Sequence, residues 1–530
     1  MTLLKRFVVI NHWGHWTYFC FNNFLNNFNI VKLKITKKKH FFLVFIPYFL
    51  LSNFSAFTQT ETMRVNLKEV VQMAQGEGPG VRIAKTKLTT NYWLYQSFLA
   101  DYKPEISVVG ELPQLNRSIR EITLPNGEQS FASSAFMNNS LGVQLSQDIA
   151  LTGGSIFAST GIERLDIFRT STAPRSTSYL SSPIVIGFNQ PFFGYNQLKW
   201  NKKIEPLRYD EAIREYSEEM EMVAFDAAEI FFDVYFAQIN LEAAERNKIN
   251  ADTLFAISKG RYSVGRIAET ELLQIELGSM NSDTELAEAT LNLQSNSEAL
   301  RNFLGIKKAI KFDLITPNDI PNFSVDPELA LKYALKNRSK TIEFQRRLAE
   351  SEAAVAQAKG QNGRNINLFG RFGLTQTASS LGDAFSDPKD QEQLTLGIQI
   401  PIADWGKAKS RMEIARSNQE LEQMNIEQER ISFEQGILLR VNQFDLVRRQ
   451  VALGTRAYEV AKKRENITRK RYLIGKIGIS DLNLAIRELN EARRNYMVTL
   501  RSFWLAYYEL RNLTLYNFEK EEHLIREVER

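Results

Sequence analysis

The feature that most constrains this fold is a helix–turn–helix signature that occurs twice. Arg471-Tyr-Leu-Ile-Gly475 and the later Ser480-Asp481-Leu482 have counterparts 210 residues earlier, in Arg261-Tyr-Ser-Val-Gly265 and Thr270-Glu271-Leu272. Glycine commonly ends a helix in a left-handed conformation, and a hydroxyl residue often caps the next one. We therefore expect Gly265 and Gly475 at tight turns, with Thr270 and Ser480 as N-caps, in a chain built from two copies of one unit.

A heptad pattern follows each turn. Such a 3.5-residue period indicates left-handed packing of helix on helix, so the repeat predicts a duplicated coiled coil. The periodic residues are Leu272, Ile275, Ser279, Ser282, Leu286, Ala289 and Leu293 in the first copy, and Leu482, Ala485, Leu489, Ala492, Tyr496, Thr499 and Phe503 in the second.

Ahead of these hairpins, each copy changes from helical to alternating periodicity and back. We expect strands at 106–110, 183–189, 366–374 and 394–400, with the second strand of each copy ending at Pro191 or Pro401, because proline donates no ladder hydrogen bond. Helices over 197–258 and 407–468 should follow. About 62 residues at ~1.5 Å each give ~93 Å, far more than a membrane is thick.

Alternation assigns the two faces of these strands. Asn367 and Arg371 share the polar face of their strand. The opposite face of these strands is apolar. The residues expected on it include Ile184, Ile186, Phe188, Leu394, Leu396 and Ile398.

The first copy is longer than the second. Gly110 matches Gly370 at an offset of 260, whereas Gly187 and Pro191 match at 210, which indicates an insertion of about 50 residues near 111–180. Two parts of it, 141–147 and 156–162, look like strands. The pattern leaves open whether they add strands to the sheet or form a hairpin outside it.

Composition argues against catalysis and metal binding. The chain has 66 Lys and Arg against 61 Asp and Glu, four histidines and one cysteine, Cys20. This excludes a disulfide framework, disfavours a His/Cys metal site and suggests no nucleic-acid partner. No P-loop, dinucleotide fingerprint or Ser/His/Asp set is present, so we expect no enzyme and no cofactor.

The N-terminus differs from the rest. Lysines at 37–39, the apolar run 41–51 and small residues up to Thr58 are typical of a signal peptide, which we place in residues 1–58 with an N-terminal extension. A transmembrane anchor is the alternative, although the run is short for one. The mature chain is expected to be exported, with repeats at 59–320 and 321–516 and a charged tail at 517–530.

The set of motifs, in this order and twice over, resembles the TolC family of outer-membrane efflux proteins. Its most specific parts are Gln190-Pro191-Phe-Phe-Gly194, which is similar to the family's strand-to-helix corner, and the two Arg-Tyr-x-x-Gly tips. The resemblance implies a mainly α fold with membrane β-strands. Three copies would form a transmembrane β-barrel of twelve strands and a periplasmic α-helical barrel. In such a barrel the apolar face of the strands would contact lipid, because only one face of a channel wall can be apolar, and Asn367 and Arg371 would face the lumen.

The same resemblance implies a function and partners. The chain would be a homotrimeric exit duct in the outer membrane of a Gram-negative bacterium, for tripartite efflux or type I secretion. Its partners would be a periplasmic adaptor, an inner-membrane transporter and outer-membrane lipid. A periplasmic coiled-coil adaptor or scaffold without a channel is the alternative, although it gives no reason for alternating apolar strands.

Three residues are candidates for a periplasmic gate. Asp481 lies nine residues after Tyr472, where the TolC pattern has an aspartate that narrows the mouth, and Glu271 is its copy. The alternative is that both are ordinary first-turn acids that favour the helix dipole. A second family aspartate and a gate arginine correspond here to Leu484 and Ile477.

The turns themselves are the second candidate site. In TolC-like channels the adaptor docks there, and the basic side chains would suit an acidic partner or phosphate groups. A solvated charged face is the alternative. The candidates are Arg261, Tyr262, Val264, Gly265, Arg471, Ile474, Gly475 and Lys476.

Overall fold

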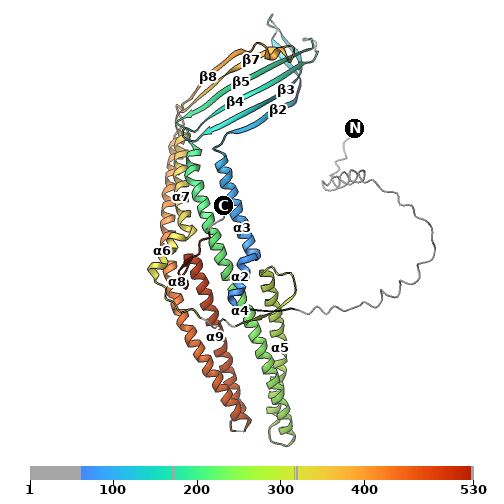
Figure 1. The fold of residues 1–530 in the computed structure, drawn as a ribbon, viewed down its shortest axis with the longest axis vertical. Helices are drawn as coiled ribbons and strands as arrows, with labels where there is room; N and C mark the ends of the chain where they lie inside the picture. The colour runs from blue at the N-terminus through green and yellow to red at the C-terminus, as the bar shows by residue number, and fades with distance from the viewer. Residues whose placement is uncertain are drawn as a thin grey trace, which may run out of the picture. The chain divides into compact units, whose positions relative to one another are not determined.

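The computed structural model describes residues 61–123, 125–169, 174–315, 317, 320–474 and 476–526. The predicted signal peptide, Cys20 and Gly475 lie outside these residues. Thr60–Arg530 forms one compact unit, which contains every described helix and strand (Figure 1).

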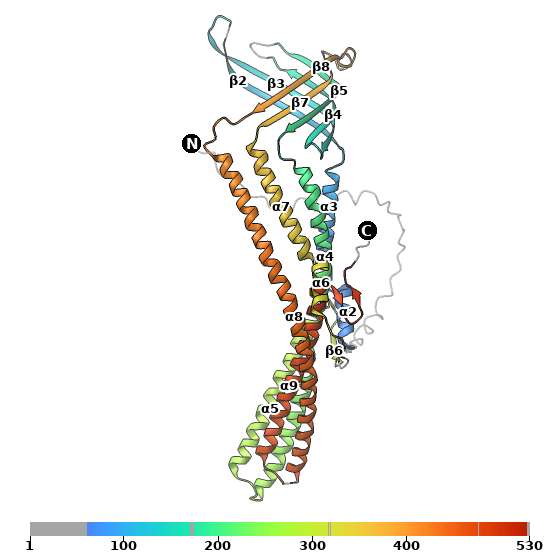
Figure 2. The ribbon, with the colours of Figure 1, turned by 90° about the vertical axis from the view of Figure 1, so that its left-hand side faces the viewer.

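Two long helices dominate the unit and confirm the expected duplication. Helices α4 (Gln197–Ser263) and α8 (Lys407–Leu473) have 67 residues each. Both their first and their last residues are 210 positions apart. Each turns back into a shorter helix, α5 (Glu269–Phe303) or α9 (Ile479–Thr514), which packs along it (Figure 2). At ~1.5 Å per residue each long helix measures ~100 Å.

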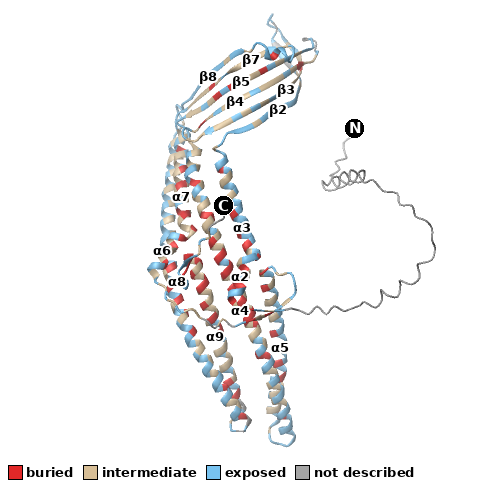
Figure 3. Ribbon diagram, viewed as in Figure 1, coloured by how far each residue is buried: buried red, intermediate tan, exposed pale blue. Residues whose placement is uncertain are grey.

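The core forms where the two copies meet. Helix α4 packs against α9 as well as α5, and buried residues gather in the middle of α4 (Figure 3). Phe444 of α8 and Phe503 of α9 have ring centroids 5.6 Å apart. Each long helix buries an apolar stripe in this core, formed by Ala224, Ala228, Phe231 and Tyr235 in α4, and by Ile437, Val441, Phe444, Val447 and Val451 in α8.

Shorter helices begin each copy and lead into its strands. Helices α2 (Leu67–Glu77) and α3 (Pro79–Ala100) lead into the first copy's strands, and α6 (Pro327–Asn337) and α7 (Ser339–Asn362) into the second's. Strands β1 (Glu61–Val65) and β6 (Ile310–Leu314), which the sequence did not predict, form a parallel pair. After α9, β9 (Tyr516–Asn517) and β10 (Glu522–His523) form a small hairpin.

The remaining strands form one antiparallel sheet in the order β2-β3-β4-β5-β7-β8. It has six strands rather than four, because the insertion joins the sheet. Strands β4 and β7 begin about 210 residues apart, as α4 and α8 do, so β4 and β5 are the counterparts of β7 and β8. The additional pair is therefore β2–β3, which begins earlier in the chain than the insertion predicted near 111–180. Their bounds are β2 Glu105–Thr123, β3 Gln129–Ile149, β4 Gly154–Ile167, β5 Ser176–Phe192, β7 Asn365–Ala378 and β8 Lys389–Gln399.

The sheet has one apolar face, as alternation predicted. Ile186 is registered with Phe372, and Phe188 with Gly370 and through it Leu394, so these side chains share a face. Asn367 and Arg371 lie on the opposite face. Exposed apolar side chains continue onto the first strand of the inserted pair, at Ile106, Val108, Leu115 and Ile119.

The strand-to-helix corners differ from the prediction. Strand β5 continues past Pro191, which is paired with Asn367, and ends at Phe192. Strand β8 ends at Gln399, two residues before Pro401. Proline therefore lies close to each strand end without itself being the residue at which the strand stops.

Candidate functional site

The first hairpin tip is a glycine-terminated helix end. Gly265 has φ +69°, and its N–H donates to the Tyr262 carbonyl at 2.9 Å while the Arg266 N–H donates to the Arg261 carbonyl at 2.9 Å. These two bonds form a Schellman motif, in which a left-handed residue closes the helix. The predicted turn at Gly265 is confirmed.

The second tip shares one of these two hydrogen bonds, and Gly475 itself lies outside the described residues. The Lys476 N–H donates to the Arg471 carbonyl at 3.0 Å, as Arg266 does to Arg261. The apolar C-cap residues Val264 and Ile474 are 67% and 66% exposed. Each tip therefore presents an apolar residue within a basic surround.

The predicted N-caps are wrong. Helix α5 is capped by Ala268 and α9 by Gly478, neither with a side-chain cap bond. Thr270 and Ser480 are second helical residues, because the Ala268 carbonyl already accepts from Leu272 at 3.2 Å. Glu271 and Asp481 are consequently third residues, where a carboxylate favours the helix dipole.

Tyr472 differs from its counterpart in environment. It is 8% exposed and shares a seven-residue spacing with Val451, Tyr458 and Glu465 on the side of α8 that faces α9. Tyr458 in that row stacks on Tyr496 of α9 with centroids 5.6 Å apart. Tyr262 is 41% exposed. Within one chain, Tyr472 thus packs in the α8–α9 seam.

Asp481 lies in a basic groove. The groove has a volume of about 900 Å³ and follows α8 and α9 upward from the tip, with Asp481 near its end. The sequence motifs did not show which residues surround Asp481. The seven-residue spacing of the basic and apolar residues on α8 would have indicated that they lie on one side of that helix. The lining includes Arg456, Val460, Lys463, Arg464, Ile467, Arg471, Ile477 and Leu484.

Helix α8 carries a second apolar stripe that the described residues leave uncovered. Its six members recur every seven residues and are 49–72% exposed: Leu439, Leu446, Leu453, Val460, Ile467 and, at the tip, Ile474. Helix α5 has a matching exposed stripe at alternating spacings of four and three, formed by Leu273, Leu277, Met280, Thr284, Ala287 and Leu291. Both stripes point away from each hairpin's own seam.

The two striped helices have opposite charge. Helix α5 has seven acidic residues and one basic residue. The lower part of α8, from Leu439 to Leu473, has ten basic residues and three acidic ones. Lys463 and Lys470 lie three residues after Val460 and Ile467, and Glu276 lies three after Leu273. Charge thus flanks both apolar stripes.

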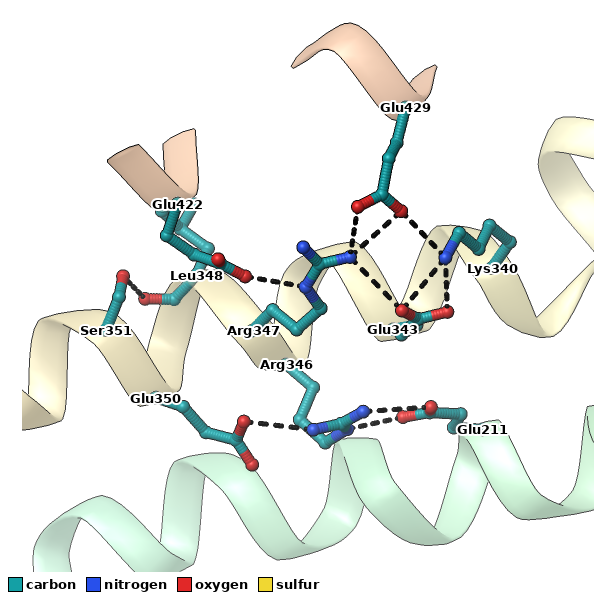
Figure 4. A network of polar contacts seen from close by, with 10 residues as sticks. All are labelled: Glu211, Lys340, Glu343, Arg346, Arg347, Leu348, Glu350, Ser351, Glu422 and Glu429. Atoms are coloured by element: carbon teal, nitrogen blue, oxygen red, sulfur yellow. Dashed lines mark hydrogen bonds and ion pairs between the residues drawn. The ribbon is translucent and has the colours of Figure 1, made fainter. Parts of the chain in front are cut away.

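Nearer the sheet, an ionic network fixes α7 between α4 and α8 (Figure 4). Arg346 donates to Glu211 of α4 at 2.6 Å, and Arg347 donates to Glu422 and Glu429 of α8 at 2.6 and 3.0 Å. Hydrogen bonds from Lys340 and then Arg347 lower the pKa of Glu429. The network holds three helix columns in register beneath the strands.

Neither a metal site nor a membrane helix is evident in the part of the chain that the structure describes. Its His, Cys, Asp and Glu side chains form no cluster of three or more suited to a metal ion. Among the same residues, no helix combines the length and the apolarity needed to cross a bilayer.

Comparison with known proteins agrees with this architecture. The model of the family "outer membrane efflux protein" matches residues 155–306 and 330–514. No curated protein matches the sequence. Among solved structures, the chain is similar to CusC, with 16% identity and a TM-score of 0.60 over 86% of this chain and 94% of that one.

Two further structures have the same fold. The Campylobacter jejuni CmeC outer membrane channel gives 16% identity and a TM-score of 0.60 over 86% of this chain and 87% of that one. The Neisseria gonorrhoeae MtrE outer membrane channel, in its open state, gives 14% identity and a TM-score of 0.56 over 84% and 88%. At such low sequence identity, the similarity to these three structures establishes the fold alone.

Long helical hairpins below a sheet with one apolar face define the class as a channel-forming subunit of the outer membrane. The family match covers more than half of the sequence. The chain belongs to the outer membrane efflux protein family. It is accordingly an outer-membrane efflux channel and no enzyme, and the alternative of a periplasmic adaptor or scaffold is excluded.

Proposed function

We propose that this efflux channel works as a homotrimer, in which α8 of one copy packs against α5 of the next. The observation that carries the proposal is the pair of uncovered stripes on these two helices. Within a chain, α4 contacts α9, so α5 and α8 are the outer helices of the two hairpins. A contact between unlike surfaces closes into a ring when the rotation allows it.

The stripes fit each other in detail. Helix α8 descends to its tip and α5 ascends from its own, so the contact is antiparallel. Placing Ile467 beside Leu273 brings Val460 beside Met280 and Leu453 beside Ala287. The same alignment puts Lys463 next to Glu276, and opposite charges at the edges of such a seam fix partner choice and orientation.

The sheet is the membrane part of the proposed channel. Its apolar face suits lipid, and the corner residues below the strands are strongly apolar and uncovered. Phe193 is 71% exposed, and Ile402 and Trp405 are 99% and 97% exposed. Aromatic side chains at strand ends are typical of the membrane interface. Repeat boundaries near 59–320 and 321–516 accord with this arrangement.

The tips are the proposed docking site for a periplasmic adaptor, which would connect the channel to an inner-membrane transporter. Supporting this are the exposed Val264 and Ile474 within the basic surround of both turns. Three copies of Asp481 around the axis would form the constriction. Tyr472 would support that ring by packing in the α8–α9 seam, with Glu271 as the weaker copy.

A charge-reversal experiment tests the assembly. Lys463→Glu combined with Lys470→Glu should convert the trimer to monomers in mild detergent, as measured by native mass spectrometry. Adding Glu276→Lys should restore part of the trimer. Lys462→Glu is the matched control, because this exposed lysine lies two residues after Val460, about 200° around the helix from the stripe. A trimer that survives the double reversal as well as the control contradicts the α5–α8 interface.

A further inference from the structure

Among the described strands, the sheet has two free edges, and both edge strands carry exposed apolar side chains, as the strands of a membrane barrel do. Strand β2 is one edge and β8 the other. On β2, Ile106 and Val108 are 73% and 71% exposed, and on β8, Leu396 and Ile398 are 57% and 58% exposed. Unpaired edges are not tolerated in lipid, so each must meet another strand.

The inserted pair β2–β3 has the pattern of its neighbours. In register, Ile106 is followed by Leu145, Ala158, Ile186, Phe372 and Glu392 across the six strands. The opposite face of β2 and β3 carries Ser107, Gln144 and Ser146. The pair therefore continues both the apolar face and the polar face of the sheet.

We propose that the β2–β3 hairpin is part of the channel wall, so that three copies close a barrel of eighteen strands, with β2 of one copy paired to β8 of the next. This inference rests on the proposed trimer. It differs from the twelve strands implied by the family resemblance. Because barrel diameter grows roughly linearly with strand number, the wall would be about 1.5 times as wide as with twelve strands.

Geometry also gives the register of the new contact. A barrel whose shear equals its strand number has strands tilted by about 36°, within the range of ~35–45° for membrane barrels. Eighteen strands then need a shift of about six residues per copy. Within one copy, the row of paired residues that starts at Ile106 reaches β8 at Glu392. A shift of six residues moves the contact on β8 from Glu392 to Ile398, so Ile106 of one copy would lie opposite Ile398 of the next.

This register matches side chains along the whole contact. Val108 falls opposite Leu396 and Gly110 opposite Leu394, all on the apolar face. On the other face, Val109 falls opposite Thr395. Residues 105–111 are thereby paired with 393–399, up to the bulge between Glu111 and Gln114, where Pro113 has no N–H to donate.

Disulfide crosslinking of the full-length protein tests the contact. In a Cys20→Ser background, Val109→Cys with Thr395→Cys should give covalent dimers and trimers under oxidation, because directly opposed residues have Cα atoms ~4.5–5.5 Å apart. The control replaces Thr395→Cys by Gln391→Cys. Gln391 lies on the same face of β8 as Thr395 but ~13 Å further along the strand. It should stay monomeric on denaturing gels.

The outcomes separate this inference from the proposed function. If β2–β3 lay outside the wall, β4 would be the edge, and Ser159→Cys or Ser155→Cys would crosslink to Thr395→Cys instead. That result, or a trimer without any Val109–Thr395 crosslink, overturns the eighteen-stranded wall and leaves the trimer intact. Absence of a trimer for the unmodified chain would refute the proposed assembly as well.

Discussion

Helices α4 and α9 are joined by a buried ion pair whose loss should be costly. Arg511 Nη2 lies 2.9 Å from Glu221 Oε2, with side chains 16% and 2% exposed. The guanidinium carbon is 5.3 Å from the ring centroid of Tyr508, and Gln75 donates to the neighbouring Met220 carbonyl at 2.8 Å. Glu221→Leu leaves the Arg511 charge buried without its partner.

The expected cost is about 3–5 kcal/mol, the usual range for breaking a buried pair from one side. Unfolding entropy is about 2.1 cal/mol/K per residue, or ~1 kcal/mol/K for a unit of this size, so Tm should fall by ~3–5 °C. Circular dichroism at 222 nm in detergent measures this change. Glu245→Ala, an exposed acid in the same helix, is the control and should shift Tm by less than ~1 °C.

The double variant Glu221→Leu/Arg511→Met decides the mechanism. Replacing both charges with apolar side chains is often neutral, so the double variant should be more stable than either single one. If its Tm loss equals the sum of the two single losses, no coupling exists between these residues. The reasoning from a buried pair would then be refuted.

Three further outcomes are expected at the tips and the sheet. In planar bilayers, Asp481→Asn should raise conductance and weaken block by multivalent cations, and Glu271→Gln should do less; no change in either would place the constriction elsewhere. Leu396→Arg should cost about 2–4 kcal/mol near the membrane midplane, whereas Thr395→Arg on the other face should assemble normally, and equal yields of folded protein would reverse the face assignment. Gly265→Ala should destabilise by about 1–2 kcal/mol in denaturant unfolding, because its φ is +69°, and equal stability would show that the turn relaxes.

Much of the architecture was predictable because it is periodic or repeated. The two-copy design, the long helices and the apolar face of the sheet all follow from spacing in the sequence. The parallel pair β1–β6 was not, because Glu61 and Ile310 are far apart in the chain and each strand has only five residues. A short local pattern cannot show such a partner.

The site was predicted less completely. Gly265 could be placed from the residue alone, because few others adopt its conformation. The N-caps could not, because Ala268 and Gly478 cap with backbone groups only. The outer stripe of α8 is visible in the sequence, but only solvent exposure distinguishes it from the inner seam. The sequence could not show that Asp481 lies among arginine and lysine side chains.

The equal length of α4 and α8 limits how this protein can change in size. Both tips lie 67 helical residues from their corners. In the proposed trimer, an insertion in one hairpin alone would therefore leave the tips at unequal heights and disturb the contact with a docked partner. The hairpins can lengthen only if seven residues are inserted in all four helices together, because this keeps the heptad seams in register. Each such insertion adds ~10 Å to the hairpins. If the tips dock as proposed, the length of these helices sets how far below the sheet the partner is bound, and that distance can change only in whole heptads.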